Sequence, residues 1–346
     1  MTDKNHPDET VLTIVQGKGT LPREQAGRNI HYDDASLSNY KMVQKGDFII
    51  HLRSFEGGLE MANENGIVSP AYTILRGKKP HSSRFYEAYF HTDEFVNHVL
   101  SKSVEGIRDG RQISYDAFKW LGLPYCSPSE QAKIAELFSV LTKRIEKQTV
   151  LVDSLKKYER GAIAHILSGK DSEFAGEAIW AEKTLSDLCC EFRSGRSISA
   201  TLIHESGDYP VYGGNGIRGY CDHYSHEGEY VVVGRQGALC GNVRLIRGQN
   251  YLSEHAIAVR ANEENDTKFL LYLLDFMNLG QYSDQGAQPG LAVNKLLRLK
   301  CNVPEKKIQS KISAFLLTYD KQIAFQESIL SLLTAQRKAF LQQLFI

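Results

Sequence analysis

The 346-residue sequence has no apolar run of membrane-spanning length and no signal-like apolar stretch near Met1. We therefore expect a cytoplasmic protein that makes no membrane contact. The formal net charge is zero, from 41 basic and 41 acidic residues, which excludes a protein that coats nucleic acid by bulk electrostatics but allows local basic faces. The six cysteines show no CxxC spacing, which is typical of reduced thiols and predicts no disulfides.

Motifs of nucleotide-dependent and metal-dependent enzymes are also missing. The chain has no P-loop and no Asn-Pro-Pro-Tyr or Asp-Pro-Pro-Tyr stretch, which marks amino-methyltransferases. Residues 214–219 fit GxGxxG, but the residues after them do not open a helix, as a dinucleotide site requires. The cysteine and histidines of 221–226 lack zinc-finger spacing, and Ser253–His255 alternate faces on a predicted strand and cannot form a triad. We therefore expect no catalytic residue and no metal site.

The chain does contain an internal repeat. Gln131–Leu167 aligns without a gap with Gln309–Phe345. The identical residues are Gln131, Lys133, Ile134, Lys143, Ile145, Gln148 and Leu155 in the first segment, and Gln309, Lys311, Ile312, Lys321, Ile323, Gln326 and Leu333 in the second. Upstream, a strand-like segment leading to Arg53 resembles one leading to Arg235. The sequence therefore predicts a tandem duplication in which each copy is a mixed α/β lobe followed by a long helix.

Each long segment has the pattern of an amphipathic helix. Ser129–Leu167 contains no proline and only one glycine, Gly161, and its apolar residues recur at steps of three and four. The positions are Ile134, Leu137, Leu141, Leu151, Leu155, Tyr158 and Ala162 in the first helix, and Ile312, Phe315, Tyr319, Ile329, Leu333 and Phe340 in the second. We predict that the helices bury these stripes against each other as an antiparallel coiled coil, which would fix the distance between the lobes. The alternative is that each helix packs only on its own lobe.

This order of lobe, helix, lobe and helix resembles the specificity subunit of type I restriction-modification systems. The helices are introduced by Pro-x-x-Gln131 and by Pro-x-x-x-x-Gln309. The segment Gly286–Leu291 and the strands that start at Asp47 and Glu229 and lead into glycine-rich turns also resemble the family's framework. The resemblance covers nearly the whole chain and implies that each lobe is a target recognition domain.

The resemblance also implies a function and a set of partners. Such subunits have no catalytic activity; they bind double-stranded DNA and read a bipartite sequence, one half-site per lobe across an unread spacer. Two modification subunits, which are adenine methyltransferases, dock on the helices, and restriction or translocase subunits join them. This chain is expected to hold no cofactor, because S-adenosylmethionine, ATP and Mg are expected on the partner subunits. The alternatives are a coiled-coil scaffold whose lobes bind protein, or a partial specificity cassette that is not functional.

The predicted fold class is α+β. The expected boundaries are 1–128 for target recognition domain 1, 129–168 for the first helix, 169–176 for a linker, 177–304 for target recognition domain 2 and 305–346 for the second helix. The second lobe opens with Trp180–Leu188, and the first lobe has no counterpart of that stretch. In a member of this family, the first lobe would then be shortened at its N-terminus and would lack an edge strand and a docking segment.

The loop after the predicted strand Val231–Val233 holds the leading candidates for base contact. Arg235 can donate two hydrogen bonds to guanine O6 and N7, and Gln236 can bond to adenine N6 and N7. The flanking glycines allow the backbone to approach a groove of DNA. The alternative is that Arg235 only pairs with a carboxylate such as Glu254 or Asp222.

Further candidates for DNA contact lie in corresponding loops of the two lobes, where basic, amide and hydroxyl side chains recur. They are Lys18, Arg23, Arg53, Ser54, Ser69, Arg108, Arg111 and Gln112 in the first lobe, and Asn215, Arg218, Ser253, His255, Gln285 and Gln288 in the second. Such side chains contact phosphates as well as base edges, so the pattern alone does not say which contact each residue makes.

Overall fold

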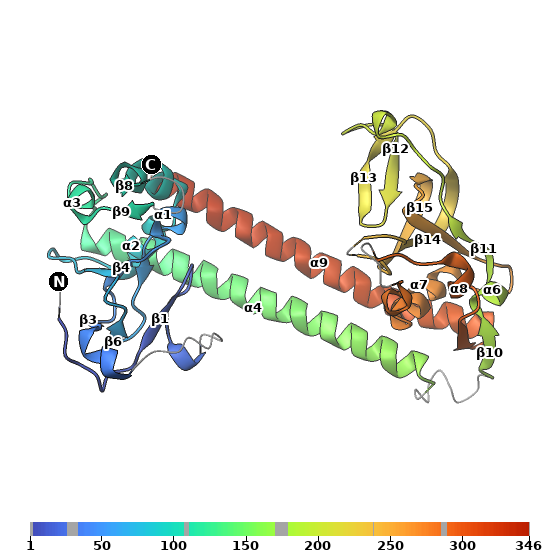
Figure 1. Cartoon of the computed structure of the whole chain (residues 1–346), viewed down its shortest axis with the longest axis horizontal. Coiled ribbons are helices and arrows are strands. Elements are labelled where there is room, and N and C mark those ends of the chain that lie inside the picture. The colour runs from blue at the N-terminus through green and yellow to red at the C-terminus, as the bar shows by residue number, and fades with distance from the viewer. Residues whose placement is uncertain are drawn as a thin grey trace. The chain divides into compact units, whose positions relative to one another are not determined.

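Two long helices, α4 (Pro128–Leu167) and α9 (Lys306–Leu344), run through a fold made of two units. Met1–Val150 and Glu327–Ile346 form the first unit, and Leu151–Gln326 forms the second. The computed structural model, drawn in Figure 1, describes residues 3–25, 34–106, 111–169, 179–237, 239–284 and 289–345. None of the helices in these ranges is both long and apolar enough to cross a bilayer. Each unit therefore combines one lobe with one end of each long helix.

The lobe of the second unit is built on a six-stranded sheet with the order β11-β16-β14-β15-β12-β13. The strands are β11 (Cys189–Ser194), β12 (Tyr209–Gly213), β13 (Gly216–Cys221), β14 (His226–Gly234), β15 (Val243–Leu252) and β16 (Ala256–Ala261). Neighbouring strands are antiparallel except β12 and β15, which pair in parallel. Val231–Val233 and Ile257–Val259 are buried, largely β-branched runs that form the middle of the sheet.

Helix α7 (Thr267–Phe276) packs on β14, β15 and β16 (Figure 1). Asp266 caps this helix, because its carboxylate accepts a hydrogen bond from the Phe269 N–H at 2.9 Å. A separate two-stranded sheet pairs β10 (Ala181–Thr184) with β17 (Lys300–Val303), and α6 (Leu185–Leu188) leads from β10 into β11. Other short helices of this lobe are η6 (Ala200–Leu202), η7 (Leu279–Tyr282) and α8 (Val293–Leu296).

The lobe of the first unit has shorter strands, which form four small sheets among the described residues. The strands are β1 (Leu12–Val15), β2 (Gly19–Pro22), β3 (Lys41–Val43), β4 (Phe48–Ile50), β5 (Glu60–Met61), β6 (Gly66–Val68), β7 (Thr73–Leu75), β8 (Val104–Glu105) and β9 (Gln112–Ile113). They pair as β1-β2, β3-β6, β5-β4-β7 and β8-β9. The helices are α1 (Ser54–Gly57), α2 (Ser83–Phe90), α3 (Tyr115–Phe118), η1 (Arg23–Gln25), η2 (Asp34–Asn39), η3 (Glu94–Val99) and η4 (Leu100–Ser103). The core of this lobe is aromatic, with Phe48, Phe85, Phe90 and Phe95 in one cluster.

A buried glutamine at the start of α4 joins this helix to the first lobe. The Oε1 atom of Gln131 accepts a hydrogen bond from the Ser82 N–H at 2.9 Å, and its Nε2 group donates to the Cys126 carbonyl at 3.0 Å. Ser82 is also the N-cap of α2, since its hydroxyl accepts from the Phe85 N–H at 3.3 Å. One glutamine side chain therefore ties the start of the long helix to the start of a lobe helix.

Gln309 makes the same bridge at the start of α9. Its Oε1 atom accepts from the Asp266 N–H at 2.9 Å, and its Nε2 group donates to the Pro304 carbonyl and to the Asn265 side chain, both at 2.8 Å. Asp266 is the N-cap of α7, as Ser82 is of α2. The two copies of the predicted duplication therefore share the hydrogen bond between the glutamine of the long helix and the N-cap residue of the lobe helix.

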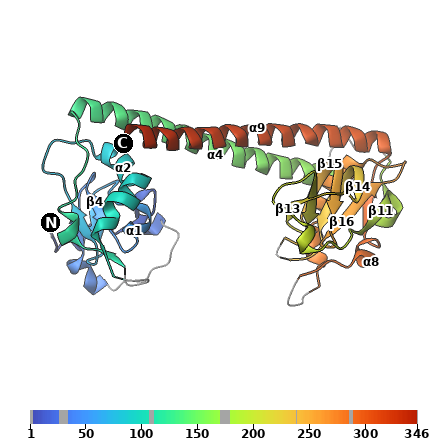
Figure 2. The same cartoon turned by 90° about the horizontal axis from the view of Figure 1, so that it is seen from above.

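Within each unit, the two long helices pack against each other in antiparallel directions. In the first unit, the Phe345 ring after the end of α9 stacks on Phe138 of α4 with centroids 6.0 Å apart. Figures 1 and 2 both show the end of α9 beside the start of α4. In the second unit, the end of α4 and the start of α9 share a core that contains Ile163, Ile166, Ile312 and Leu316. The predicted antiparallel pairing is confirmed, and packing of each helix on its own lobe alone is excluded.

The faces that pair match the predicted apolar stripes only in part, since Leu141, Ile312 and Leu333 are buried as predicted but other predicted positions are exposed. Leu137, Leu151 and Tyr158 of α4 are 37%, 42% and 69% exposed, and Phe315 of α9 is 40% exposed. The buried positions are Gln131, Ala135, Phe138, Leu141, Val152, Ile163, Ile166 and Leu167 in α4, and Gln309, Ile312, Ser313, Leu316, Ile323, Leu333 and Leu341 in α9. The physical reason is that the ends of each helix also pack on a lobe, so the buried face follows two partners and not a single heptad repeat.

Acidic side chains from α4, α7 and α9 lie close together in the second unit. The Tyr272 hydroxyl donates to the Asp320 carboxylate, and Glu159 is a neighbour of the same carboxylate. Burial, together with Asp320, raises the pKa of Glu159 to about 7. Burial and Asp320 also raise the pKa of Asp275. Protonation of Glu159 therefore favours the packing of these three helices.

The stability of the second unit is expected to fall as the pH rises from about 4.5 to about 7. Unfolded Glu159 loses its proton near its ordinary pKa of 4.5, whereas the folded state keeps the proton up to about 7, so its contribution is fully present only below pH 4.5. Glu159→Gln should weaken this dependence, to which Asp275 still contributes, and Glu146→Gln, at an exposed position of the same helix, should leave it unchanged. Denaturant unfolding at about pH 5 and about pH 8 measures the difference. An unchanged pH dependence in the Glu159 variant would contradict this assignment.

The six cysteines are free thiols. Burial raises the pKa of Cys189 to about 12 and that of Cys301 to about 11, so both thiols stay protonated near neutral pH. Among the described residues, no group of three or more His, Cys, Asp and Glu side chains is arranged to hold a metal ion.

The N-caps of α2 and α7, Ser82 and Asp266, provide a common reference for comparing the strands of the two lobes. Leu75 of β7 lies as many residues before Ser82 as Val259 of β16 lies before Asp266. Leu75 pairs with Phe48 on β4, and Val259 pairs with Val231 on β14. Phe48 and Val231 are therefore equivalent positions of the two sheets.

Candidate nucleic-acid interface

Three turns of the second lobe meet at one edge of the large sheet. They are the loop 235–237 after β14, the turn 253–255 between β15 and β16, and the turn 214–215 between β12 and β13. The Arg235 N–H donates to the His255 carbonyl at 2.9 Å. A Cβ atom added at Gly214 would lie 2.6 Å from the Gln236 carbonyl oxygen, so only glycine lets the hairpin come this close. The turns are therefore held together through their backbones, which leaves side chains available for contact.

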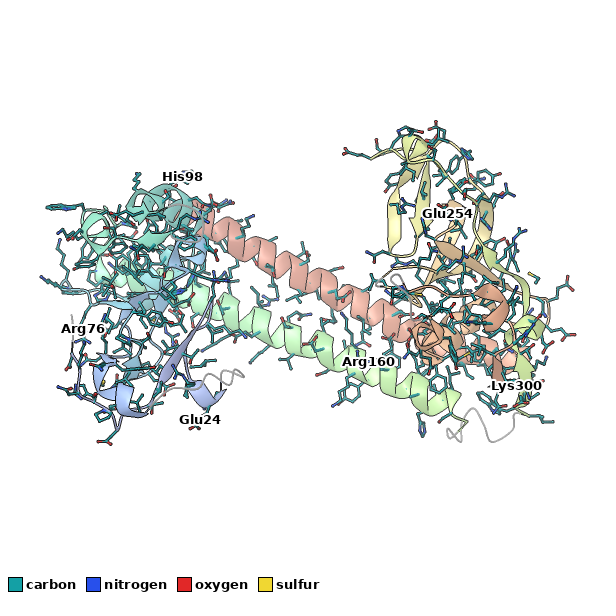
Figure 3. The ribbon with its side chains drawn as sticks, viewed as in Figure 1. Glu24, Arg76, His98, Arg160, Glu254 and Lys300 are labelled. Carbon is teal, nitrogen blue, oxygen red and sulfur yellow. The ribbon has the colours of Figure 1, made fainter. Side chains whose placement is uncertain are left out.

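Two of these turns carry a group of neighbouring polar residues, the Arg235 cluster, which consists of Arg235, Gln236, Ser253, Glu254 and His255. His255 Nδ1 lies 2.7 Å from Gln236 Oε1, and His255 Nε2 lies 3.3 Å from Glu254 Oε1. Arg235 Nη1 donates to the Glu254 carbonyl at 3.2 Å. The position of Glu254 in the lobe is labelled in Figure 3. Among the described residues Arg235 forms no ion pair with a carboxylate, so that alternative is not the role of this side chain here.

Three buried atoms of the Arg235 cluster have no hydrogen-bond partner in the structure. They are Arg235 Nε, Ser253 Oγ and Glu254 Oε2. An unsatisfied buried polar group costs about 1–3 kcal/mol, so three in adjoining turns call for an explanation. Arg235 and Glu254 are only half-buried, and rotation of these side chains would offer donors for guanine and an acceptor for cytosine N4. Ser253 is fully buried, and its contact with DNA stays a prediction.

Arginines flank this cluster on the β12–β13 hairpin. Asn215 and Arg218 are exposed on the hairpin, as expected for side chains that contact DNA. Arg244 of β15 lies against the same hairpin, because a Cβ atom added at Gly216 would be 2.7 Å from its Nη1 atom. Arg244 and Glu254 were not predicted as DNA contacts, and Glu254 was considered as an ion-pair partner of Arg235. The antiparallel register of β14 and β15 places Arg244 near the end of β14, and this register comes from the structure and not from the sequence.

In the first lobe, Arg53 is exposed and lines a cavity of about 570 Å³ beside β1. His51 and Tyr72 form part of the cavity wall. Ser54 is buried, and its hydroxyl accepts a hydrogen bond from the His51 N–H at 2.9 Å, so this serine stabilises the turn. Burial lowers the pKa of His51 to about 4, so its ring is neutral near neutral pH. DNA contact by Arg53 and Ser54 stays a prediction.

Lys18 and Arg23 border the β1–β2 hairpin of the same lobe. Lys18 is exposed at the turn, where the buried Glu60 carboxylate accepts hydrogen bonds from the N–H groups of both flanking glycines at 2.7 and 2.9 Å. Arg23 Nε donates to the Thr13 hydroxyl of β1 at 3.4 Å. Because Arg53 also faces β1, the structure places Arg23 and Arg53 along the same strand.

Arg111 and Gln112 lie beside α1, the helical turn that follows Arg53. The Arg111 guanidinium is 4.7 Å from the centre of the Phe55 ring, a cation–π contact that holds it over α1. Gln112 is exposed at the start of β9, which packs on α1. These two residues and Arg53 are therefore brought together from distant parts of the sequence.

The remaining predicted contacts do not join these groups. Ser69 is half-buried at the end of β6, and its hydroxyl accepts from the Ala71 N–H at 3.3 Å. Arg108, Gln285 and Gln288 lie outside the described residues. Their contact with DNA stays a prediction.

Within the strands, the register makes Phe48 the counterpart of Val231, one residue away from the alignment read from the sequence. Arg53 and Arg235 lie beyond these strand pairs, and Arg53 leads into α1 whereas Arg235 does not lead into a helix, so their correspondence stays a prediction. A shift of one residue exchanges the two faces of a strand, so the two strands present different faces of the repeat.

The fold defines the class of the protein as a tandemly duplicated α+β protein with polar turns on each lobe and paired long helices. The family profile described as type I restriction modification DNA specificity domain matches residues 178–335. The specificity subunit of the type I restriction enzyme EcoprrI from Escherichia coli is 38% identical over 223 residues, which are 60% of this chain and 54% of that protein. A Mycoplasma pneumoniae protein described as a type I specificity subunit N-terminus is 32% identical over 136 residues, 38% of this chain and 73% of that protein.

Solved structures of the same kind share the fold. The crystal structure of a type I restriction-modification system S subunit from M. genitalium superposes with a TM-score of 0.66 at 19% identity and covers 100% of this chain and 96% of that one. A chain from a structure on complex assembly and conformational transition of the type I system has a TM-score of 0.56 at 16% identity and covers 100% of this chain and 94% of that one.

The chain belongs to the family of type I restriction-modification specificity subunits. In sequence, it spans about half the length of curated relatives that it matches: 54% of the Escherichia coli protein, 39% of one from Haemophilus influenzae and 45% of one from Mycoplasma pneumoniae. The likeness to the solved structures concerns the fold.

Proposed function

We propose that this chain is the sequence-specific DNA-binding subunit of a type I restriction-modification complex and that it has no catalytic activity of its own. The duplication is the observation that carries the proposal. Two lobes of one fold each present basic and amide side chains on turns, and each is joined to a long helix by an equivalent buried glutamine. A protein with two similar DNA-binding lobes suits a DNA target made of two half-sites, one for each lobe.

In this proposal, the Arg235 cluster reads bases of one half-site. Its guanidinium, amide and carboxylate groups match the hydrogen-bonding edges of bases in the major groove. Arg218, exposed on the neighbouring hairpin, contacts phosphates and fixes the register. Lys18, Arg53 and Arg111 of the first lobe serve the other half-site, whose sequence differs because the two edges carry different side chains.

The chain acts with partners in the cytoplasm. Two modification subunits dock on the paired helices and bring S-adenosylmethionine to an adenine of each half-site, and restriction or translocase subunits with ATP and Mg join them. A chain of zero net charge gains little affinity from phosphate contacts alone. We therefore expect weak DNA binding by the isolated chain and tight binding by the complex.

Methylome mapping of cells that express the chain with its modification subunit tests this function. Methylated adenines should fall in one bipartite motif, with an unread spacer between two fixed halves. Cells with the modification subunit alone provide the control and should lack the motif. Absence of a motif that depends on this chain would contradict the proposal and favour a scaffold that binds protein.

A further inference from the structure

The first lobe contains an apolar groove that the proposed DNA contacts do not use. Its volume is about 730 Å³, and we call it the first-lobe groove. The apolar lining includes Phe48, Leu75, Tyr86, Phe118, Leu123 and Tyr125. Leu123 is 38% exposed and Tyr125 is 52% exposed, so large apolar side chains face solvent here. An exposed apolar surface of this kind marks an interaction site more often than chance.

The second lobe shows what covers the equivalent surface there. The equivalents of Phe48, Leu75, Phe118 and Tyr125 are Val231, Val259, Leu296 and Val303, and all four are buried. They belong to the same core cluster as Leu185 and Leu188 of α6, neither of which is exposed. In the second lobe, the segment β10–α6–β11 therefore covers the surface that corresponds to the first-lobe groove.

Backbone pairing holds this segment on both sides. β10 is antiparallel to β17, and β11 is antiparallel to β16. Between them, the Leu185 N–H donates to the Leu299 carbonyl at 3.0 Å, and the Asn262 N–H donates to the Leu188 carbonyl at 3.0 Å. The matching positions in the first lobe, Leu121 and Lys78, lie at the groove or next to it.

Among the described residues of the first unit, no segment takes this place. β7, the counterpart of β16, ends the sheet order β5-β4-β7. Residues 122–125, the counterpart of β17, form no strand. The groove therefore runs between two chain segments whose counterparts both pair with the covering segment.

The charges of the groove and of the covering segment are complementary. The groove is lined by Lys78, Lys79 and His81, together with Arg76 and Lys119, which already pair with Asp47 and Asp116, and no Asp or Glu is among its lining residues. The segment of the second lobe carries three carboxylates, Glu182, Asp187 and Glu191, against the single lysine Lys183, and Glu182 pairs with Lys300 of β17 at 2.7 Å. An acidic segment therefore fits the basic rim, as it does in part in the second lobe.

We propose that the first-lobe groove is a docking site for a partner polypeptide segment with the chemistry of Trp180–Phe192. The segment has a short strand, a helical turn with leucines at the first and fourth positions and a second strand, with carboxylates toward the basic rim. Its strands pair with residues 122–125 and with Leu75–Gly77, and its leucines enter the groove. The apolar floor favours leucine side chains over a nucleotide, whose sugar and phosphates need polar partners.

A labelled peptide of residues Ile179–Ser194, kept reduced, tests the proposal with the full chain. Fluorescence anisotropy should show saturable binding of one peptide per chain. Asp in place of both Leu185 and Leu188 in the peptide should weaken binding by about tenfold or more, because each buried leucine contributes strongly to association. Leu123→Asp with Tyr125→Asp in the chain should weaken binding similarly, whereas Leu52→Asp, at an exposed position outside the groove, should not.

Hydrogen exchange locates the bound peptide and checks the variants. Residues 73–79 and 119–125 should become protected, and circular dichroism should show that the groove variant keeps its helices. No binding up to about 1 mM, or equal binding to the groove variant, would overturn the proposal. Two other results, obtained without any peptide binding, would also overturn the proposal. If the chain forms a dimer that the groove variant abolishes, the groove binds a second copy of the chain. If the chain binds ATP and the groove variant does not, the groove binds a small anion.

Discussion

Glutamate in place of Arg235 is expected to erase one half of the recognition sequence and to leave the other half readable. The variant replaces guanidinium donors at the centre of the Arg235 cluster with a carboxylate that repels phosphates. Loss of one good base contact is worth about 1–3 kcal/mol, so affinity of the complex for its target should fall by about 10-fold to 100-fold. Binding of DNAs scrambled in one half-site at a time, measured by fluorescence anisotropy, reports each half separately.

Arg298→Glu is the matched control for this prediction. Arg298 is an exposed arginine of the same unit outside the three turns, and the substitution changes the charge by the same amount. It should weaken binding only slightly and for both half-sites alike. Arg53→Glu should affect the opposite half-site. Equal losses from Arg235→Glu and Arg298→Glu would mean that Arg235 acts only through bulk charge.

Alanine in place of Gln309 is expected to destabilise the second unit by about 2–4 kcal/mol. The substitution removes three hydrogen bonds and leaves the Asp266 N–H, the Asn265 side chain and the Pro304 carbonyl without their partner in a buried place. Trp180 lies in the second unit and Trp120 in the first, and they are the two tryptophans of the chain. Urea unfolding followed by Trp180 fluorescence in a Trp120→Phe background measures this effect.

Two further variants test whether the Gln309 effect is specific. Gln249→Ala removes an exposed glutamine of the same unit and should change the free energy of unfolding by no more than about 0.5 kcal/mol. Gln131→Ala removes the equivalent bridge of the first unit and should be detected by Trp120 fluorescence in a Trp180→Phe background. A Gln309 variant as stable as the Gln249 variant would show that the bridge does not contribute to stability.

The long helices and the duplication were predictable because their signals are local. Proline lies at or just before the start of each helix, glycine is nearly absent within them, and the repeated glutamines keep their register. The buried face of each helix was predictable only in part, because it depends on contacts with a lobe as well as with the other helix. Leu137 and Phe315 fit the repeat and are exposed, whereas Ala135 and Leu316 are buried.

The candidate DNA contacts were predictable as types of residue on turns, but their arrangement was not. Arg235 and His255 lie on different turns, and a backbone hydrogen bond brings these turns together. The sequence carries no signal for this long-range contact. Ser54 shows that a polar residue on a turn need not contact DNA. Its hydroxyl accepts a hydrogen bond from the His51 N–H and stabilises the turn, a role that the sequence does not distinguish from DNA contact. The one-residue difference between the sequence alignment and the strand register at Phe48 arose because similar short strands align in more than one register.

The glutamine bridges have a consequence for how such chains diversify. The bonds that Gln131 makes, and most of those that Gln309 makes, reach main-chain atoms of the lobes, so the attachment places few demands on lobe side chains. A lobe of different sequence would keep this attachment if its main chain offered the same donors and acceptors at these places.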